Sequence, residues 1–255
     1  MILDKGSLAS RETWVRYTPD GRALIAMLGS VALVVGALSC ATYVATPSRG
    51  VAYFLLYAIA GALAFGVALP LGYTAFVRRE GPESLGITAK RLPSSLILQA
   101  ICCAPLVPKL IVSMRGIDPE SMLPLVALAL SIGFFEAVFW RGWVYGTLER
   151  SFGVVPALIL GAALYAVYHV GYGMPASEML FLFFIGLMFN AAFALRGNIF
   201  ILWPFFQPSG QLVTVIKDGL KLPTIATLGF AEALVGMIAL AVLAGKISAK
   251  GRSVR

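Results

Sequence analysis

The sequence predicts an all-α protein, a bundle of helices that crosses a membrane about eight times. Of its 255 residues, 59% are hydrophobic and only 13% are charged, and the mean hydropathy is +0.88. A soluble domain is nearer half apolar and a quarter charged. The apolar residues also form long runs, and a run of roughly 20 lets one helix span a bilayer. We therefore expect a single integral membrane domain over residues 1–255, multi-pass in the cell membrane.

The candidate spans follow one another with short connections. They are residues 23–45, 51–77, 92–114, 122–148, 154–173, 179–196, 199–216 and 222–246. The first run follows 22 mostly polar residues, and the second has Gly and Ala every few positions, as closely packed membrane helices do. The third and seventh contain prolines, in CCAPLVPKL (102–110) and WPFFQPSGQ (203–211). Broken helices at membrane depth need protein or water around them, so both segments are expected to face the bundle interior.

Connections that are rich in Lys and Arg alternate along the chain with connections that have few of them. The rich ones are segment 1–22, residues 78–91, the surroundings of Arg150 and of Arg196, and the tail 246–255. Because Lys and Arg are retained in cytoplasmic loops, both termini, including segment 1–22, are predicted to be cytoplasmic. This distribution also accounts for the net charge of +8 without a nucleic-acid partner, since no long basic tract is present.

Polar residues inside the apolar runs are functional candidates by default. They are Gln99, Lys109, Glu136, Arg141, His169, Asn190, Gln207, Gln211 and Glu232. Glu136 lies in FFEAVFWRGWVYGTLER (134–150), where a carboxylate costs at least ~2.5 kcal/mol to insert. At 1.5 Å per residue it lies about 18 Å from the helix end near Leu148, and His169 lies about 22 Å from Val154. The acid and the only histidine therefore reach a similar depth on antiparallel neighbours and can meet.

The neighbours of this pair have less certain roles. On an α-helix Arg141 points about 140° away from Glu136, nearer the surface, where it can extend to water. Its role is therefore either structural or catalytic. Tyr165 lies four residues before His169 on the same helix face and is expected to hold the imidazole.

Two further polar residues are expected to be structural. Asn190 is expected to form an interhelical hydrogen bond, and Glu232 an ion pair with Lys109 or Arg141.

A metal site is the main alternative explanation for a Glu–His pair. Catalytic zinc usually needs three protein ligands, and the chain has a single histidine, so we expect no metal and no cofactor.

Three short segments carry motif-like residues in order: EAVFWRG (136–142), YAVYH (165–169) and QPSGQ (207–211). Over residues 82–215 the chain resembles a divergent member of the CAAX protease and bacteriocin-processing family, the abortive-infection or glutamic intramembrane proteases. The family motifs are Glu-Glu-x-x-x-Arg with a following Gly, Phe-x-x-x-His, and His-x-x-x-Asn. Ala137 replaces the second Glu, and glutamines stand in the third motif.

The resemblance implies an intramembrane, metal-independent endopeptidase. Glu136 and His169 would activate a water molecule, while Gln207 and Gln211 would stabilise the oxyanion or position the substrate. Trp140, within the first motif, would be a supporting residue. The implied partners are a membrane-anchored protein or peptide substrate, the lipid bilayer and further membrane proteins.

Two other functions remain open. Because Ala137 and the two glutamines depart from the motifs, the protein could be an inactive scaffold of the same family that binds a partner or substrate helix. Glu136, His169 and Glu232 could instead line the path of a proton-linked transporter, although the chain has no evident inverted repeat. The sequence does not choose among prenylated proteins, bacteriocin precursors and sorting signals as substrates.

Overall fold

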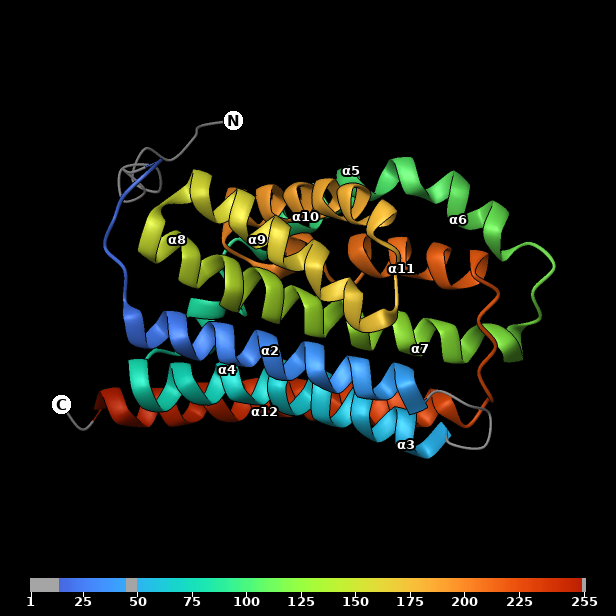
Figure 1. Ribbon diagram of the computed structural model, residues 1–255, viewed down its shortest axis with the longest axis horizontal. Helices are drawn as coiled ribbons and strands as arrows, with labels where there is room; N and C mark the ends of the chain where they lie inside the picture. Colours follow the sequence, from blue (N-terminus) through green and yellow to red (C-terminus); the bar gives the residue numbers. More distant parts are fainter. Residues whose placement is uncertain (1–13, 45–49, 254–255) are drawn as a thin grey trace.

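The computed structural model describes residues 14–44 and 50–253, and every regular element within them is helical, which confirms the predicted fold class (Figure 1). Seven helical stretches in these residues are long and apolar enough to cross a membrane. They are Gly21–Val44, Gly50–Arg78, Leu92–Met114, Pro119–Phe152, Val154–Tyr172, Ala176–Arg196 and Ala226–Lys250. The protein is therefore multi-pass.

Several of these spans consist of more than one regular segment. The helices are α2 (Gly21–Val44), α3 (Gly50–Phe54), α4 (Leu69–Gly72), α5 (Leu92–Cys103), α6 (Val107–Met114), α7 (Pro119–Glu136), α8 (Gly146–Phe152), α9 (Val154–Tyr168), α10 (Ala176–Arg196), α11 (Phe206–Lys217) and α12 (Ala226–Ser253). Wider π-type turns join α3 to α4 over Leu55–Ala68 and α7 to α8 over Ala137–Tyr145.

The predicted seventh span, 199–216, is not one membrane-length helix. A short 3₁₀ turn, Ile199–Ile201, is followed by an irregular stretch and then by α11, which has only 12 residues. Pro204 explains the break, because proline has no N–H for a helical hydrogen bond. The two pieces together still run from one end of the bundle to the other. The C-terminal end of α12 therefore lies at the same end of the bundle as the start of α2 (Figure 1).

The third span contradicts the expectation that both proline-containing segments face inward. Residues 104, 105 and 107–109 are exposed, and only Cys103 in that segment is buried. Pro105 and Pro108 each lie in the first turn of a short helix, where a missing N–H costs nothing. The break therefore needs no enclosure. Segment 203–211 does face inward, with Phe206, Gln207 and Pro208 buried.

The fourth span is the centre of the bundle. Every residue from 131 to 145 is buried, and 72% of the span's most apolar window is enclosed, the largest share of the seven. A helix that is apolar on all sides can face lipid or protein, and here other helices enclose it. The few polar side chains in this stretch, Glu136 and Arg141 among them, are therefore held in the protein interior.

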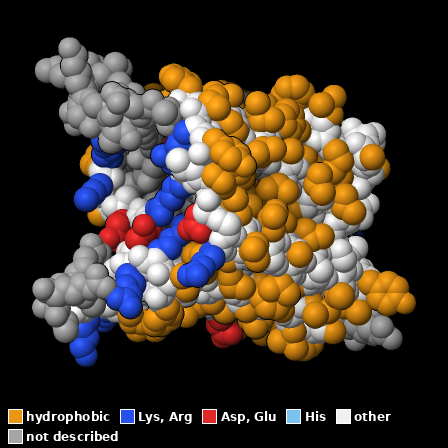
Figure 2. Space-filling model, turned by 60° about the vertical axis from the view of Figure 1, so that its left-hand side comes forward, with side chains coloured by type: hydrophobic (Ala, Val, Ile, Leu, Met, Phe, Trp, Pro, Cys, Tyr) orange, Lys and Arg blue, Asp and Glu red, His pale blue; other side chains and the backbone are white. Residues whose placement is uncertain are grey.

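The two ends of the bundle differ in charge. One end, which we call the basic end, carries Arg16, Arg22, Arg78, Arg79, Lys90, Arg91, Arg150, Arg196, Lys246 and Lys250. The connecting segments of the opposite, less basic end carry Arg115, Lys217 and Lys221. Figure 2 shows blue and red side chains gathered on the left, whereas orange side chains cover most of the rest of that face. This asymmetry is the one from which cytoplasmic termini are predicted.

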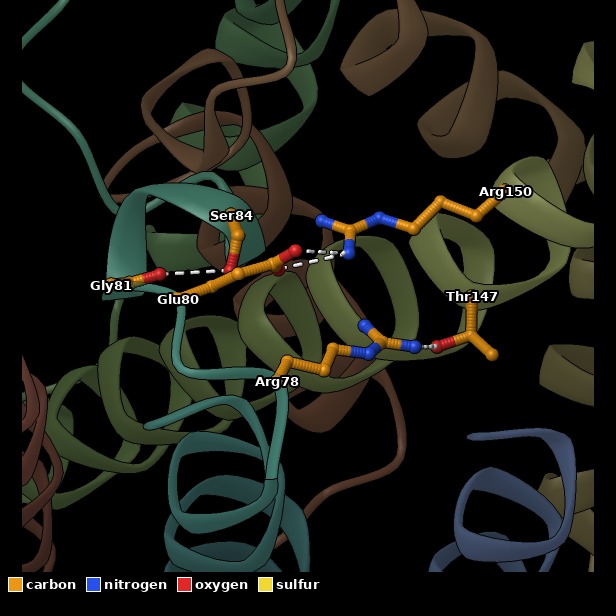
Figure 3. A network of polar contacts seen from close by, with 6 residues as sticks. All are labelled: Arg78, Glu80, Gly81, Ser84, Thr147 and Arg150. Carbon is orange, nitrogen blue, oxygen red and sulfur yellow. Dashed lines mark hydrogen bonds and ion pairs between the residues drawn. The ribbon is translucent and has the colours of Figure 1, made fainter. Parts of the chain in front are cut away.

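Polar contacts at the basic end join the segment after the second span to α8 (Figure 3). Arg150 forms an ion pair of 2.8 Å with Glu80, and Arg78 donates a hydrogen bond of 3.3 Å to Thr147. These residues line a cleft of about 210 Å³. Because the two paired side chains are 41% and 37% exposed, the ion pair contributes at most about 1 kcal/mol. It orients the connecting segment more than it stabilises the bundle.

Candidate active site

The carboxylate of Glu136, the last residue of α7, accepts hydrogen bonds from three side chains. The Tyr168 hydroxyl donates to Oε1 at 2.5 Å, and the Tyr165 hydroxyl donates to Oε2 at 3.2 Å. Nε2 of Gln207, on α11, also donates to Oε2. Glu136 is only 2% exposed, and a buried carboxylate is costly unless such donors replace water. The donors come from two other helices, so the bundle itself fixes the position of this acid.

The imidazole of His169 lies beside the same tyrosines. Its Nδ1 is 2.8 Å from the carbonyl oxygen of Tyr165, so Nδ1 carries the hydrogen and Nε2 can accept a proton. Its ring centroid is 4.9 Å from that of Tyr165 and 4.4 Å from that of Tyr168. Tyr165 thus contacts the imidazole with both its ring and its carbonyl oxygen, as their spacing on one helix face led us to expect. Within the described residues no hydrogen bond joins Glu136 and His169 directly, yet both contact the same two side chains.

Arg141 corrects an expectation. It does not extend to the membrane surface, because its side chain is fully buried. Arg141 lies in the π-type turns, whose i→i+5 hydrogen bonds bring residues five apart toward the same side of the helix. The guanidinium carbon lies 4.4 Å from the ring centroid of Tyr165 and 5.1 Å from that of Phe189. Arg141 therefore packs against Tyr165, one of the two tyrosines that donate to Glu136, and such cation–π contacts contribute about 2 kcal/mol when shielded from water.

Gln207 and Gln211 share one face of α11, because that helix continues through Pro208 and Gly210. Gln207 is 1% exposed, and its Nε2 bonds to Glu136. Oε1 of each glutamine is buried and lacks a hydrogen-bond partner among the described residues. The Pro208 ring lies so close to Gly133 on α7 that a Cβ there would be 2.6 Å from its Cγ. This close approach brings α11 against the helix that ends at Glu136.

Two residues expected to support the site, Asn190 and Trp140, make contacts in the bundle interior. Nδ2 of Asn190 donates to the carbonyl oxygen of Leu158 on α9 at 3.3 Å, so the expected interhelical hydrogen bond is confirmed. Trp140 is 1% exposed, and its ring contacts Tyr165 at 5.8 Å and Tyr168 at 4.7 Å between centroids. It therefore packs on both tyrosines that donate to Glu136.

The expected ion pair of Glu232 with Lys109 or Arg141 is wrong. Glu232 is exposed on the outer face of α12, and Lys109 is exposed on α6. Arg141, in contrast, is enclosed in the bundle centre. Neither Glu232 nor Lys109 takes part in the ion pair between Arg150 and Glu80. The predicted ion pair was wrong because hydropathy does not indicate which face of an apolar helix is exposed.

The sequence reasoning missed Tyr168, Tyr172 and Tyr57. Tyr168 bonds to Glu136, and its hydroxyl is also 3.0 Å from that of Tyr172. The signal for two of them was present, since positions 165, 168, 169 and 172 recur at the three-to-four-residue spacing of one helix face. Tyr57 comes from the second span, more than a hundred residues away, and no local pattern indicates it.

The hydrogen bonds of the Glu136 carboxylate predict a ranking of two variants. Tyr168→Phe removes a 2.5 Å bond to a buried acid, and bonds to charged groups contribute about 1.5–3 kcal/mol. Tyr165→Phe removes a longer bond of 3.2 Å and keeps the ring contacts with Arg141 and His169. We expect Tyr168→Phe to lower the thermal unfolding temperature in detergent more than Tyr165→Phe does. The reverse order would contradict this geometry.

The fold and this cluster define a class: a multi-pass membrane protein with an acid, a histidine and amide side chains converging inside its helix bundle. Residues 118–205 match the family model described as "Rce1-like: Type II CAAX prenyl endopeptidase Rce1-like". The matched segment includes Glu136, Arg141 and His169 and ends just before Gln207. The resemblance to the CAAX proteases is thus confirmed for this segment. Comparison with curated proteins and with solved structures gives no match.

Proposed function

We propose that the protein is an intramembrane endopeptidase of the glutamic type, which hydrolyses a peptide bond of a membrane-associated protein or peptide. One observation carries this proposal. The two motif residues Glu136 and His169, 33 positions apart in the family-matched segment, contact the same pair of tyrosines in the bundle centre. A third helix adds the amide of Gln207. An acid, a base and an amide donor converge at one place.

The proposed mechanism uses these side chains on a water molecule. The Glu136 carboxylate removes a proton from the water as its oxygen attacks the peptide carbonyl carbon, and Nε2 of His169 holds or relays that proton. When the intermediate collapses, the proton passes to the leaving amine. A positioned general base of this kind contributes about 10²–10⁴-fold to the rate. The arrangement needs no metal ion.

Amide donors would stabilise the oxyanion. The NH₂ group of Gln207 has two hydrogens, and the one that is not bonded to Glu136 can be donated to the substrate oxygen. Gln211, one turn further along α11, offers a second NH₂ group on the same face. Donors already aimed at a developing oxyanion contribute ~2.7–4 kcal/mol each. The substrate would reach them from the bilayer, as a membrane-anchored chain, with further membrane proteins as partners.

The proposal is tested by searching for an uncleaved precursor. Membrane proteomes are compared among a deletion strain, the same strain with the wild-type protein, and that strain with His169→Ala. We expect one or a few membrane-anchored proteins to keep an extra terminal peptide in the deletion and in the His169→Ala strain only. If His169→Ala restores processing as well as the wild type, the proposed mechanism is wrong, and an inactive scaffold explains the fold better.

A further inference from the structure

A chain of tyrosine hydroxyls leads away from Glu136. The Tyr168 hydroxyl, which donates to Glu136, lies 3.0 Å from the Tyr172 hydroxyl. The Tyr172 hydroxyl in turn lies 3.2 Å from that of Tyr57. All three separations fall within the range of O–H···O or slightly longer hydrogen bonds. The carboxylate is therefore the first member of a continuous path of four groups.

The path runs from the bundle centre toward the less basic end. Tyr168 is fully buried, whereas Tyr172, the last residue of the fifth span, is only half-buried. Tyr57 is 4% exposed. It lies near the start of the second span, which begins at the less basic end. Two spans thus contribute hydroxyls to one line that ends near the membrane boundary.

Ring packing fixes the geometry of this line. The Tyr168 and Tyr172 centroids are 5.4 Å apart at an interplanar angle of 76°, and those of Tyr57 and Tyr172 are 5.9 Å apart at 67°. Tyr53 stacks on Tyr57 at 5.5 Å. Edge-to-face and stacked pairs of this kind hold aromatic rings in defined orientations. The hydroxyls are therefore aligned without a need for mobile side chains.

Each tyrosine hydroxyl can donate one hydrogen and accept another. Since the Glu136 carboxylate can only accept, the Tyr168 hydrogen points to it, and the Tyr172 and Tyr57 hydrogens then point the same way. A proton can move along such a line by exchange. Glu136 takes the Tyr168 proton while Tyr168 takes that of Tyr172, Tyr172 takes that of Tyr57, and Tyr57 takes one from water. Only O–H bonds form and break, and no electrons are transferred.

We propose that Tyr168, Tyr172 and Tyr57 form a proton relay between Glu136 and water at the less basic end of the bundle. Such a relay returns Glu136 to its ionised or protonated state through side chains of the second and fifth spans, whereas Gln207 and Gln211 lie on α11. This use of the relay rests on the proposed function, because it treats Glu136 as a base. The relay itself requires only that the carboxyl group exchange protons with solvent.

The relay is tested by hydrogen–deuterium exchange at the Glu136 carboxyl group. The protein is labelled with ¹³C-glutamate, placed in lipid bilayers, and titrated until the infrared C=O band of protonated Glu136 appears. The band is assigned by its loss in Glu136→Gln. After a change to D₂O, its shift reports the exchange rate at this one group. If the tyrosines contributed only to structure, their loss would leave that rate unchanged or raise it through local opening, whereas loss of a relay lowers it.

Three single-hydroxyl deletions are compared. Tyr172→Phe and Tyr57→Phe each interrupt the relay but leave the Tyr168 bond to Glu136 in place, and we expect exchange to slow by about tenfold or more. Tyr53→Phe is the matched control, because its ring stacks on Tyr57 while its hydroxyl is outside the line of hydrogen bonds among the described residues. Its exchange rate should equal that of the wild type.

The outcomes are distinct from those for the proposed function. Exchange that is equally fast in all three variants overturns the relay, whatever the enzyme does. If one of the two interrupting variants does not fold, the other gives the same answer. Slow exchange in them, together with full cleavage by Glu136→Gln, leaves the relay in place and removes the proposed peptidase mechanism.

Discussion

Glu136→Gln is expected to lower cleavage of the substrate at least about a hundredfold while the protein still folds, because an amide cannot remove a proton from water. The folded state tolerates the change. An amide oxygen at the Oε2 position still accepts from Tyr165 and Gln207, and the NH₂ group at the Oε1 position can donate to the Tyr168 oxygen. Activity is measured by release of the terminal peptide from the precursor identified by proteomics, and folding by thermal unfolding in detergent.

Glu232→Gln is the matched control for this experiment. It makes the same chemical change at a carboxylate that is exposed on the outer face of α12, away from the tyrosines. We expect wild-type cleavage from it. Loss of activity in Glu232→Gln but not in Glu136→Gln would place the chemistry elsewhere. Proton-dependent solute flux that requires Glu232 would support the transporter alternative instead.

Gly142→Ala is expected to be among the most destabilising substitutions in the chain. A Cβ at Gly142 would lie 3.0 Å from the carbonyl carbon of Leu85 and closer still to its oxygen. These are backbone atoms of the 3₁₀ turn Pro82–Leu85, packed on the fully buried π-type segment, and neither side can yield. Overpacking usually costs about 1–3 kcal/mol, and contact with fixed backbone places this case at about 3 kcal/mol or above.

Gly146→Ala provides the control four residues further on. There the nearest atom to the added Cβ is the Arg141 carbonyl oxygen at 3.8 Å, an ordinary contact. Since Gly in a helix is less favourable than Ala by about 0.5–1 kcal/mol, this variant should be as stable as the wild type or slightly more so. Expression in membranes and the unfolding temperature in detergent compare the two. Equal stability of both variants would mean that the 3₁₀ turn does not pack on the central helix.

The spans were predictable because membrane-spanning helices must be long and apolar, and both properties are visible in the sequence. The match in depth between Glu136 and His169 was predictable for the same reason, since rise per residue and antiparallel order fix it. Their shared contacts with Tyr165 and Tyr168 are in line with that estimate. Local helical spacing also indicated the face that carries Tyr165 and His169.

The rest depended on packing that a single sequence does not display. Arg141 was placed wrongly because the estimate assumed 3.6 residues per turn, whereas the chain there has π-type turns. Lys109 and Glu232 were predicted to lie in the interior because hydropathy does not distinguish the faces of an apolar helix. Both side chains are exposed. Tyr57 could not be found, because its partner Tyr172 is 115 positions away.

The most direct test of the central claim is an experimental structure in a lipid environment, at a resolution that shows ordered water. The claim is that Glu136 and His169 together prepare one water molecule for attack. It predicts a water within about 3.2 Å of both the Glu136 carboxylate and Nε2 of His169, with the Gln207 amide on the same side. Side chains in contact with no water between them, or Nε2 turned away from the carboxylate, would contradict the account.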